Sequence, residues 1–159
     1  ILPGVGAYSS LINKLKKNID IENLSNEILI KKKPFLGMCV GMQILSTNGY
    51  EFDECKGLNW IEGKVKIIEN KKLPHIGWNS VNIIKETEIT KGLDDKQDFY
   101  FVNIFFFEEK NKDNIIAETK YDQNFCSIIK EKNIFGVQFH PEKSQKAGQL
   151  LIKNFCNLK

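Results

Sequence analysis

The first third of the chain alternates between short apolar runs and helical spacing. Residues 1–2 read as the end of a strand, and residues 3–6, Pro-Gly-Val-Gly, as a glycine-rich turn. Residues 8–17 carry apolar side chains three and four positions apart, which predicts a helix. A second helix is predicted over residues 21–32, with Asp20 as its N-cap.

An apolar run over residues 35–38 predicts a buried strand, and helical spacing returns after it. Cys39 stands on the turn between this strand and a helix predicted over residues 40–47, which Asn48 and Gly49 would end. Beyond it, short apolar runs alternate with charged and turn residues, as in a series of strands. The predicted elements there are strands over residues 64–68, 78–84, 99–107, 115–119, 125–129 and 134–139, and a helix over residues 144–158.

This order of elements predicts an α/β fold to which antiparallel strands have been added. The 159 residues are enough for one core and show no internal repeat or linker, so a single domain over residues 1–159 is expected. No apolar run is long enough to span a bilayer, and no signal-peptide pattern is present. A cytoplasmic protein without membrane contact is the expectation.

The charge pattern argues against a nucleic-acid partner. The net charge is +3, and all 23 basic residues are lysine. Proteins that read nucleic acids depend on arginine for bidentate contacts to guanine and phosphate. The scattered lysines therefore indicate a solvated surface.

The cysteine spacing excludes the common cysteine scaffolds. No C-x-x-C pair occurs, so neither a zinc site nor a disulfide framework is expected. Free thiols suit a reducing compartment, in which one of them can serve as a nucleophile. The four candidates are Cys39, Cys55, Cys126 and Cys156.

Cys39 lies in a G-x-C-x-G motif between a strand and a helix, with Gly37 and Gly41 on either side. A sharp turn of this kind is the nucleophile elbow of hydrolases, which needs glycines because its backbone is strained. The helix that follows would lower the thiol pKa, so that Cys39 would be the first cysteine to react with iodoacetamide. The amide of Val40 could serve an oxyanion hole. A buried cysteine in a glycine-containing corner remains the alternative.

His140, Pro141 and Glu142 form a compact corner after the last predicted strand. A cysteine nucleophile needs an imidazole to move its proton and a carboxylate to orient that imidazole. A structural histidine at the end of a strand is the alternative. The turn at Gly4, Val5 and Gly6 could present backbone N–H groups to an anion, although most such turns are only turns.

Three segments together resemble one family. Residues 33–43, KPFLGMCVGMQ, resemble the nucleophile segment of class I (triad-type) glutamine amidotransferases, and residues 136–144, GVQFHPEKS, are similar to their His–Glu segment. Residues 74–79, PHIGWN, resemble in particular the glutaminase subunits of imidazole glycerol phosphate synthase, a histidine-pathway enzyme. The resemblance extends from residue 1 to about Phe155.

The resemblance implies a flavodoxin-like three-layer αβα sandwich with additional antiparallel strands. It implies a glutaminase, without metal or cofactor, in which Cys39 is the nucleophile, His140 the general base and acid, and Glu142 the orienting partner. Gln43 would hold the substrate glutamine, and the backbone of residues 4–6 would form a mobile oxyanion strand. The implied partner is a cyclase subunit of β/α-barrel type that forms a heterodimer and receives the ammonia.

The chain departs from the family at three places. The strand, helix and strand that the family carries before the glycine loop are absent, which suggests an N-terminally truncated copy whose stability would rise if that segment were restored. Asn103, Ile104 and Phe105 stand where the family has His-Ser-Tyr, and Asp122 replaces a glycine. Two other functions therefore stay open: an amidotransferase subunit that supplies ammonia for surface-polysaccharide sugars, and a catalytically weakened binding subunit.

Overall fold

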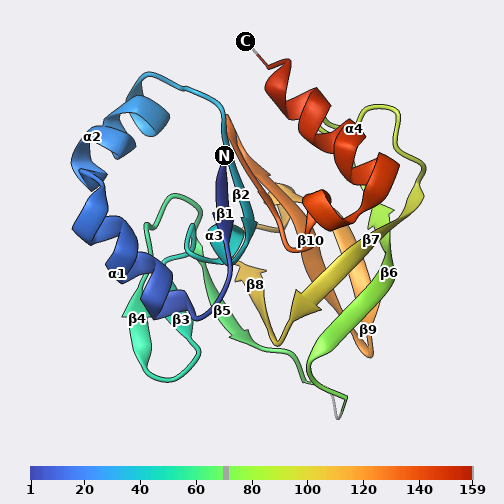
Figure 1. Cartoon of the computed structure of the whole chain (residues 1–159), viewed down its shortest axis with the longest axis horizontal. Helices are drawn as coiled ribbons and strands as arrows, with labels where there is room; N and C mark the ends of the chain where they lie inside the picture. Colours follow the sequence, from blue (N-terminus) through green and yellow to red (C-terminus); the bar gives the residue numbers. More distant parts are fainter. Residues whose placement is uncertain (70–71, 159) are drawn as a thin grey trace.

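The structure, a computed structural model, describes residues 1–69 and 72–158. Two sheets form its framework (Figure 1). The larger sheet has seven strands in the order β1 (Leu2–Gly4), β2 (Phe35–Cys39), β11 (Ile134–Val137), β10 (Gln123–Glu131), β9 (Ile115–Tyr121), β6 (His75–Ile83) and β7 (Lys96–Asn103). The smaller sheet has four strands in the order β4 (Glu54–Lys56), β3 (Asn48–Tyr50), β5 (Gly63–Ile67) and β8 (Phe105–Glu109).

Only one part of the larger sheet is parallel, and it lies around β2. β1 and β11 both pair with β2 in parallel register, with Gly4 opposite Cys39 and Gly136 opposite Gly37. The other neighbours in this sheet pair antiparallel. Because parallel strands end at the same edge of a sheet, the residues that follow β1, β2 and β11 meet there, where α/β proteins bind ligands.

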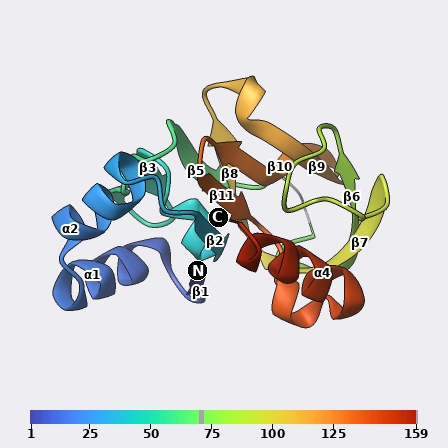
Figure 2. The same ribbon diagram turned by 90° about the horizontal axis from the view of Figure 1, so that it is seen from above.

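Helices cover both faces of the larger sheet. Side chains alternate along β2, so Phe35 and Cys39 belong to one core and Leu36 and Met38 to the other. Figure 2 shows α1 and α2 on one side of β1 and β2, and α4 on the other. The helical segments are α1 (Tyr8–Asn18), α2 (Ile21–Ser25), the π-helix η1 (Asn26–Ile30), α3 (Val40–Gln43), the 3₁₀ turns η2 (Lys112–Asn114) and η3 (Pro141–Lys143), and α4 (Gln145–Cys156).

Most predicted elements are confirmed. The α/β fold with added antiparallel strands is present, as are the first and last helices and the strand before Cys39. The side chain of Asp20 caps α2 by accepting a hydrogen bond from the backbone N–H of Asn23 at 3.1 Å. The helix predicted over residues 21–32 is shorter, because the chain winds into a π-helical turn after Ser25.

Three predicted elements were wrong. The turn at residues 3–6 begins later, because Pro3 and Gly4 extend β1. The helix after Cys39 ends at Gln43 instead of residue 47, and Asn48–Tyr50 forms β3, since residues 48–49 pair with β5. The strand predicted over residues 99–107 is broken at Ile104: β7 belongs to the larger sheet and β8 to the smaller.

Candidate active site

Cys39 occupies a strained turn at the edge where the parallel strands end. Its backbone has φ 54° and ψ −115°, which a residue with a side chain adopts only when the surroundings impose it. The flanking glycines allow the turn, because β1, β2 and α3 approach closely there. A Cβ atom on Gly41 would lie 2.0 Å from the carbonyl oxygen of Leu2, and one on Gly37 would lie 2.4 Å from that of Gly41. The G-x-C-x-G spacing therefore follows from backbone packing around Cys39.

The thiol of Cys39 is buried, with 5% of the residue exposed. Its Sγ lies 3.8 Å from the carbonyl oxygen of Val102, to which the thiol can donate, and 3.8 Å from Nε2 of Gln138. Burial raises the pKa of Cys39 to about 11, and the negative charge of Glu142 acts in the same direction, whereas a hydrogen bond from the Val40 backbone opposes it.

The expectation of a lowered Cys39 pKa was therefore wrong. The helix that follows the thiol has only four residues, and the loss of solvent outweighs the hydrogen bond from the backbone of Val40 at its start. The thiol is neutral at pH 7 in the free protein. It consequently needs a base in the site before it can attack.

His140 supplies an imidazole at the same edge of the sheet. Its Nδ1 lies 2.7 Å from Oε1 of Glu142. Because a carboxylate only accepts, Nδ1 carries the hydrogen and Nε2 keeps its lone pair for a proton. The backbone of His140 is fixed by its N–H bond to the carbonyl of Tyr100 at 2.8 Å. The hydroxyl of Ser144 donates to the His140 carbonyl at 2.6 Å and accepts from the Tyr100 N–H at 3.0 Å.

Cys39 and His140 line one cavity of about 360 Å³. Four other predicted site residues are among its lining: Val5, Gly6, Val40 and Gln43. Gly4 is not, because it lies within β1 under the backbone of α3. The structure thus brings together the predicted nucleophile, the predicted base and most of the predicted binding residues.

The comparisons with known proteins decide the family. The family model "Glutamine amidotransferase class-I" matches residues 1–158. The chain belongs to this family. Among curated amidotransferase relatives, the imidazole glycerol phosphate synthase subunit HisH of Pelagibacter ubique is 46% identical, over 99% of this chain and 78% of that protein. The subunit HisH 1 of Campylobacter jejuni (strain RM1221) is 43% identical, over 99% of this chain and 80% of that protein.

Solved structures agree on the amidotransferase fold. A crystal structure of a glutamine amidotransferase superimposes with a TM-score of 0.72 and 13% identity, over 97% of this chain and 77% of that one. A glutamine amidotransferase from Thermotoga maritima gives a TM-score of 0.65 and 19% identity, over 98% of this chain and 60% of that one. At these identities the likeness concerns the fold alone.

Gln43 of this amidotransferase has structural partners as well as a place in the cavity lining. Only 5% of it is exposed, so its amide is not a solvent-facing group. Its Nε2 donates to the carbonyl oxygen of Phe105 and to Oε1 of Gln138, both at 3.0 Å. These two bonds fix the direction of the amide beside Cys39.

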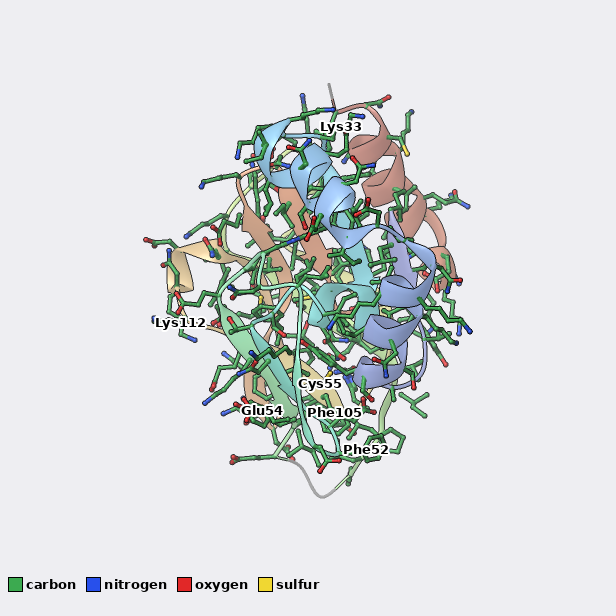
Figure 3. The ribbon with its side chains drawn as sticks, turned by 90° about the vertical axis from the view of Figure 1, so that its left-hand side faces the viewer. Lys33, Phe52, Glu54, Cys55, Phe105 and Lys112 are labelled. Atoms are coloured by element: carbon green, nitrogen blue, oxygen red, sulfur yellow. The ribbon has the colours of Figure 1, made fainter. Side chains whose placement is uncertain are left out.

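The unusual segment after β7 also reaches the cavity. Asn103 is buried and accepts a hydrogen bond from Nδ1 of His75 at 3.2 Å, while its Nδ2 donates to the Phe105 carbonyl at 3.1 Å. Ile104 lies at the cavity with 38% exposure. The side chain of Phe105, labelled in Figure 3, packs against the core that contains Phe35 and Cys39. Asp122 has a φ of 60°, a conformation that explains a glycine in the family and that aspartate tolerates.

Sequence reasoning missed two charged residues of the cavity, Glu51 and Lys143. Oε2 of Glu51 accepts a hydrogen bond from the Tyr8 N–H at 2.6 Å. Lys143 was visible beside Glu142, but no sequence signal placed Glu51 near Cys39. Within residues 1–69 and 72–158, no group of three or more His, Cys, Asp or Glu side chains could hold a metal ion. No helix in the same ranges could cross a membrane.

Proposed function

We propose that this protein is the glutaminase subunit of imidazole glycerol phosphate synthase. It hydrolyses glutamine to glutamate and ammonia, and the ammonia passes to a cyclase subunit in histidine biosynthesis, within the cytoplasm. One observation carries the chemical part of the proposal: a strained cysteine and a carboxylate-oriented histidine line the same cavity. The curated relatives support the biosynthetic part, because they are named as HisH subunits of that synthase.

Catalysis begins when glutamine fills the cavity and excludes water. Nε2 of His140 accepts the thiol proton while Sγ of Cys39 attacks the carboxamide carbon. The oxyanion is held by the Val40 N–H together with backbone N–H groups of the Val5–Gly6 loop. His140 then protonates the departing nitrogen, which leaves as ammonia, and a thioester remains. A water that gives its proton to His140 attacks the thioester, glutamate is released, and the departing Cys39 thiolate takes that proton back from His140.

The polar groups in the cavity suit an α-amino acid. Glu51 offers a carboxylate for the substrate ammonium group, and Lys143 an ammonium for the substrate carboxylate. The raised Cys39 pKa fits this scheme, since a neutral thiol must give its proton to a base before it can attack.

Exposed apolar side chains at and near the cavity support a docked partner, and the family resemblance implies that this partner is a cyclase of β/α-barrel type. Val5 and Ile104 line the cavity and are 80% and 38% exposed. Ile76 and Trp78, from the neighbouring strand β6, and Phe52, after β3, are also exposed. Figure 3 places Phe52 at the lower end of the molecule, below Phe105. A cyclase seated over this end would receive ammonia without its release into water.

The segment from Asn103 to Phe105 favours a second candidate function. It carries no hydroxyl group where the family has serine and tyrosine. The alternatives are therefore a subunit that supplies ammonia to a sugar-modifying synthase and a binding subunit with weak turnover.

A glutaminase assay tests the proposal. Glutamate release is measured for the chain alone, with the cyclase subunit of imidazole glycerol phosphate synthase, and with a sugar-modifying synthase. The proposal expects stimulation by the cyclase only. Stimulation by the sugar-modifying synthase alone would assign the other pathway, and no release with either would leave a binding subunit.

A further inference from the structure

Gln138 is a buried polar residue that the mechanism above does not use. It lies between β11 and His140, is fully buried, and does not line the cavity. Its backbone N–H donates to the carbonyl oxygen of Ser127 at 2.9 Å, which anchors it to β10. Its side chain lies between Gln43 and Cys39.

The direction of the Gln138 amide follows from its partners. The carbonyl oxygen of Phe105 can only accept, so the NH₂ group of Gln43 must face it, at 3.0 Å. The second hydrogen of that NH₂ group goes to Oε1 of Gln138, also at 3.0 Å. The NH₂ group of Gln138 is thereby turned toward Sγ of Cys39, 3.8 Å away. The Phe105 carbonyl is itself held in place, since Nδ2 of Asn103 also donates to it at 3.1 Å.

Besides the hydrogen bond from the Val40 backbone, two groups at Sγ have opposite effects on the neutral and charged forms of the sulfur. The Val102 carbonyl, at 3.8 Å, accepts from the thiol and would repel a thiolate. The Gln138 N–H is a donor, and a donor favours the charged form. When the proton leaves for His140, the bond to Val102 is lost and the bond from Gln138 strengthens.

We propose that Gln138 is a positioning residue for glutamine hydrolysis: oriented through Gln43 by the Phe105 carbonyl, its amide holds Sγ of Cys39 and stabilises the thiolate as it forms. This proposal rests on Cys39 being the nucleophile of the glutaminase. It gives Gln43 a role in nucleophile activation in addition to its place in the cavity lining.

Charged and titratable groups around Cys39 act on the same equilibrium. Glu142 disfavours the thiolate and Lys143 favours it. His140 and Glu51 face the same cavity. A test must therefore change the amide of Gln138 without changing any of these four side chains.

Gln138→Met meets this condition, because methionine has a similar length but neither donor nor charge. Ser127→Ala is the matched control: it removes a fully buried hydroxyl without a hydrogen-bond partner, from the residue whose backbone anchors Gln138. Both changes are made with the half-buried Cys55 and the exposed Cys156 replaced by serine, so that these thiols do not consume reagent.

The first readout is the pH profile of Cys39 alkylation by iodoacetamide, located by mass spectrometry, over the range in which circular dichroism shows an intact fold. Gln138→Met should raise the midpoint by about one pH unit, equivalent to about tenfold less thiolate at a given pH. A change in access alone would alter the plateau and leave the midpoint in place. Ser127→Ala should keep the parent midpoint.

The second readout is steady-state glutamine hydrolysis. Gln138→Met should lower kcat about tenfold with KM within about twofold, because Gln138 does not line the cavity. If Gln138→Met does not fold, Gln43→Met tests the same chain of hydrogen bonds by alkylation, which requires no bound glutamine. Gln43→Met should also raise the midpoint of Cys39 alkylation, by less than the shift expected for Gln138→Met. When both single variants fold, the double variant should show less than the sum of their shifts.

An unchanged midpoint in Gln138→Met, or in Gln43→Met where only that variant folds, would overturn the positioning role. An equal shift in Ser127→Ala would also overturn it, because the effect would then come from loosened packing. A parent protein that does not hydrolyse glutamine with any synthase would instead refute the proposed function, while the alkylation profile would still report on Gln138.

Discussion

The pairing of His140 with Glu142 gives a graded prediction for two substitutions. Nδ1 of the imidazole donates to Oε1 of Glu142 over 2.7 Å, and half of the Glu142 side chain is exposed. Glu142→Gln keeps an oxygen that can accept this hydrogen bond but removes the charge that stabilises the imidazolium. His140→Ala removes the proton carrier itself. The histidine variant should therefore lose far more turnover than the glutamine variant.

The expected losses follow from these contacts. A hydrogen bond to a charged group contributes about 1.5–3 kcal/mol net, and the exposure of Glu142 places its contribution at the lower end. A loss of about 1.5 kcal/mol corresponds to roughly a tenfold lower kcat. General acid–base catalysis contributes about 100- to 10,000-fold, which is the loss expected for His140→Ala.

The assay is glutamate release at saturating glutamine, with the cyclase partner present and the melting curve of each variant recorded. Glu86→Gln, at an exposed position after β6, is the control for a lost surface charge and should match the parent protein. Combined with His140→Ala, Glu142→Gln should add almost nothing, since the two residues act as a unit. Equal losses in the two single variants, or near-normal turnover in His140→Ala, would refute the assigned roles.

Three further predictions concern the elbow, the thiols and the segment after β7. Gly41→Ala should destabilise the protein by more than about 3 kcal/mol in urea unfolding, because its Cβ would lie 2.0 Å from the Leu2 carbonyl oxygen; an unchanged midpoint would contradict the close approach. At neutral pH, iodoacetamide should modify exposed Cys156 before Cys39, whose pKa is raised to about 11. An electrophilic glutamine analogue should instead modify Cys39 first. Peptide mapping that shows the reverse order for either reagent would count against a buried neutral thiol in a glutamine site. Replacing residues 103–105 by His-Ser-Tyr should raise glutamine affinity or stimulation by the cyclase, whereas unchanged kinetics would indicate that the segment differs only in packing.

The two local features of the active site, the turn at Cys39 and the His140–Glu142 pair, could be predicted from the sequence. The G-x-C-x-G spacing predicted a sharp turn, and the close approach of Gly41 to β1 explains why glycine is needed there. The His140–Glu142 pair was also predictable, because the two residues are neighbours in the sequence and their contact is local.

The parts that depend on long-range contacts were not predictable. Apart from Asn103, apolar and aromatic residues fill positions 99–107, so the sequence alone does not indicate that the chain leaves the larger sheet at Ile104. Residues 48–49 read as the end of a helix but pair with Lys64 and Val65 of β5, much later in the chain. Glu51 reaches the cavity only because this second sheet forms. The raised pKa of Cys39 likewise depends on burial by distant segments and not on the short helix beside it.

The central claim is that Cys39 attacks glutamine in the cavity it shares with His140. The most direct measurement follows glutamate and ammonia release by the parent protein and by Cys39→Ala, each with the cyclase subunit. The two proteins must have the same melting temperature, so that a loss of activity does not come from unfolding. The account predicts equal amounts of both products from the parent protein and none above background from Cys39→Ala. Sustained glutamate release by the folded Cys39→Ala variant would contradict it.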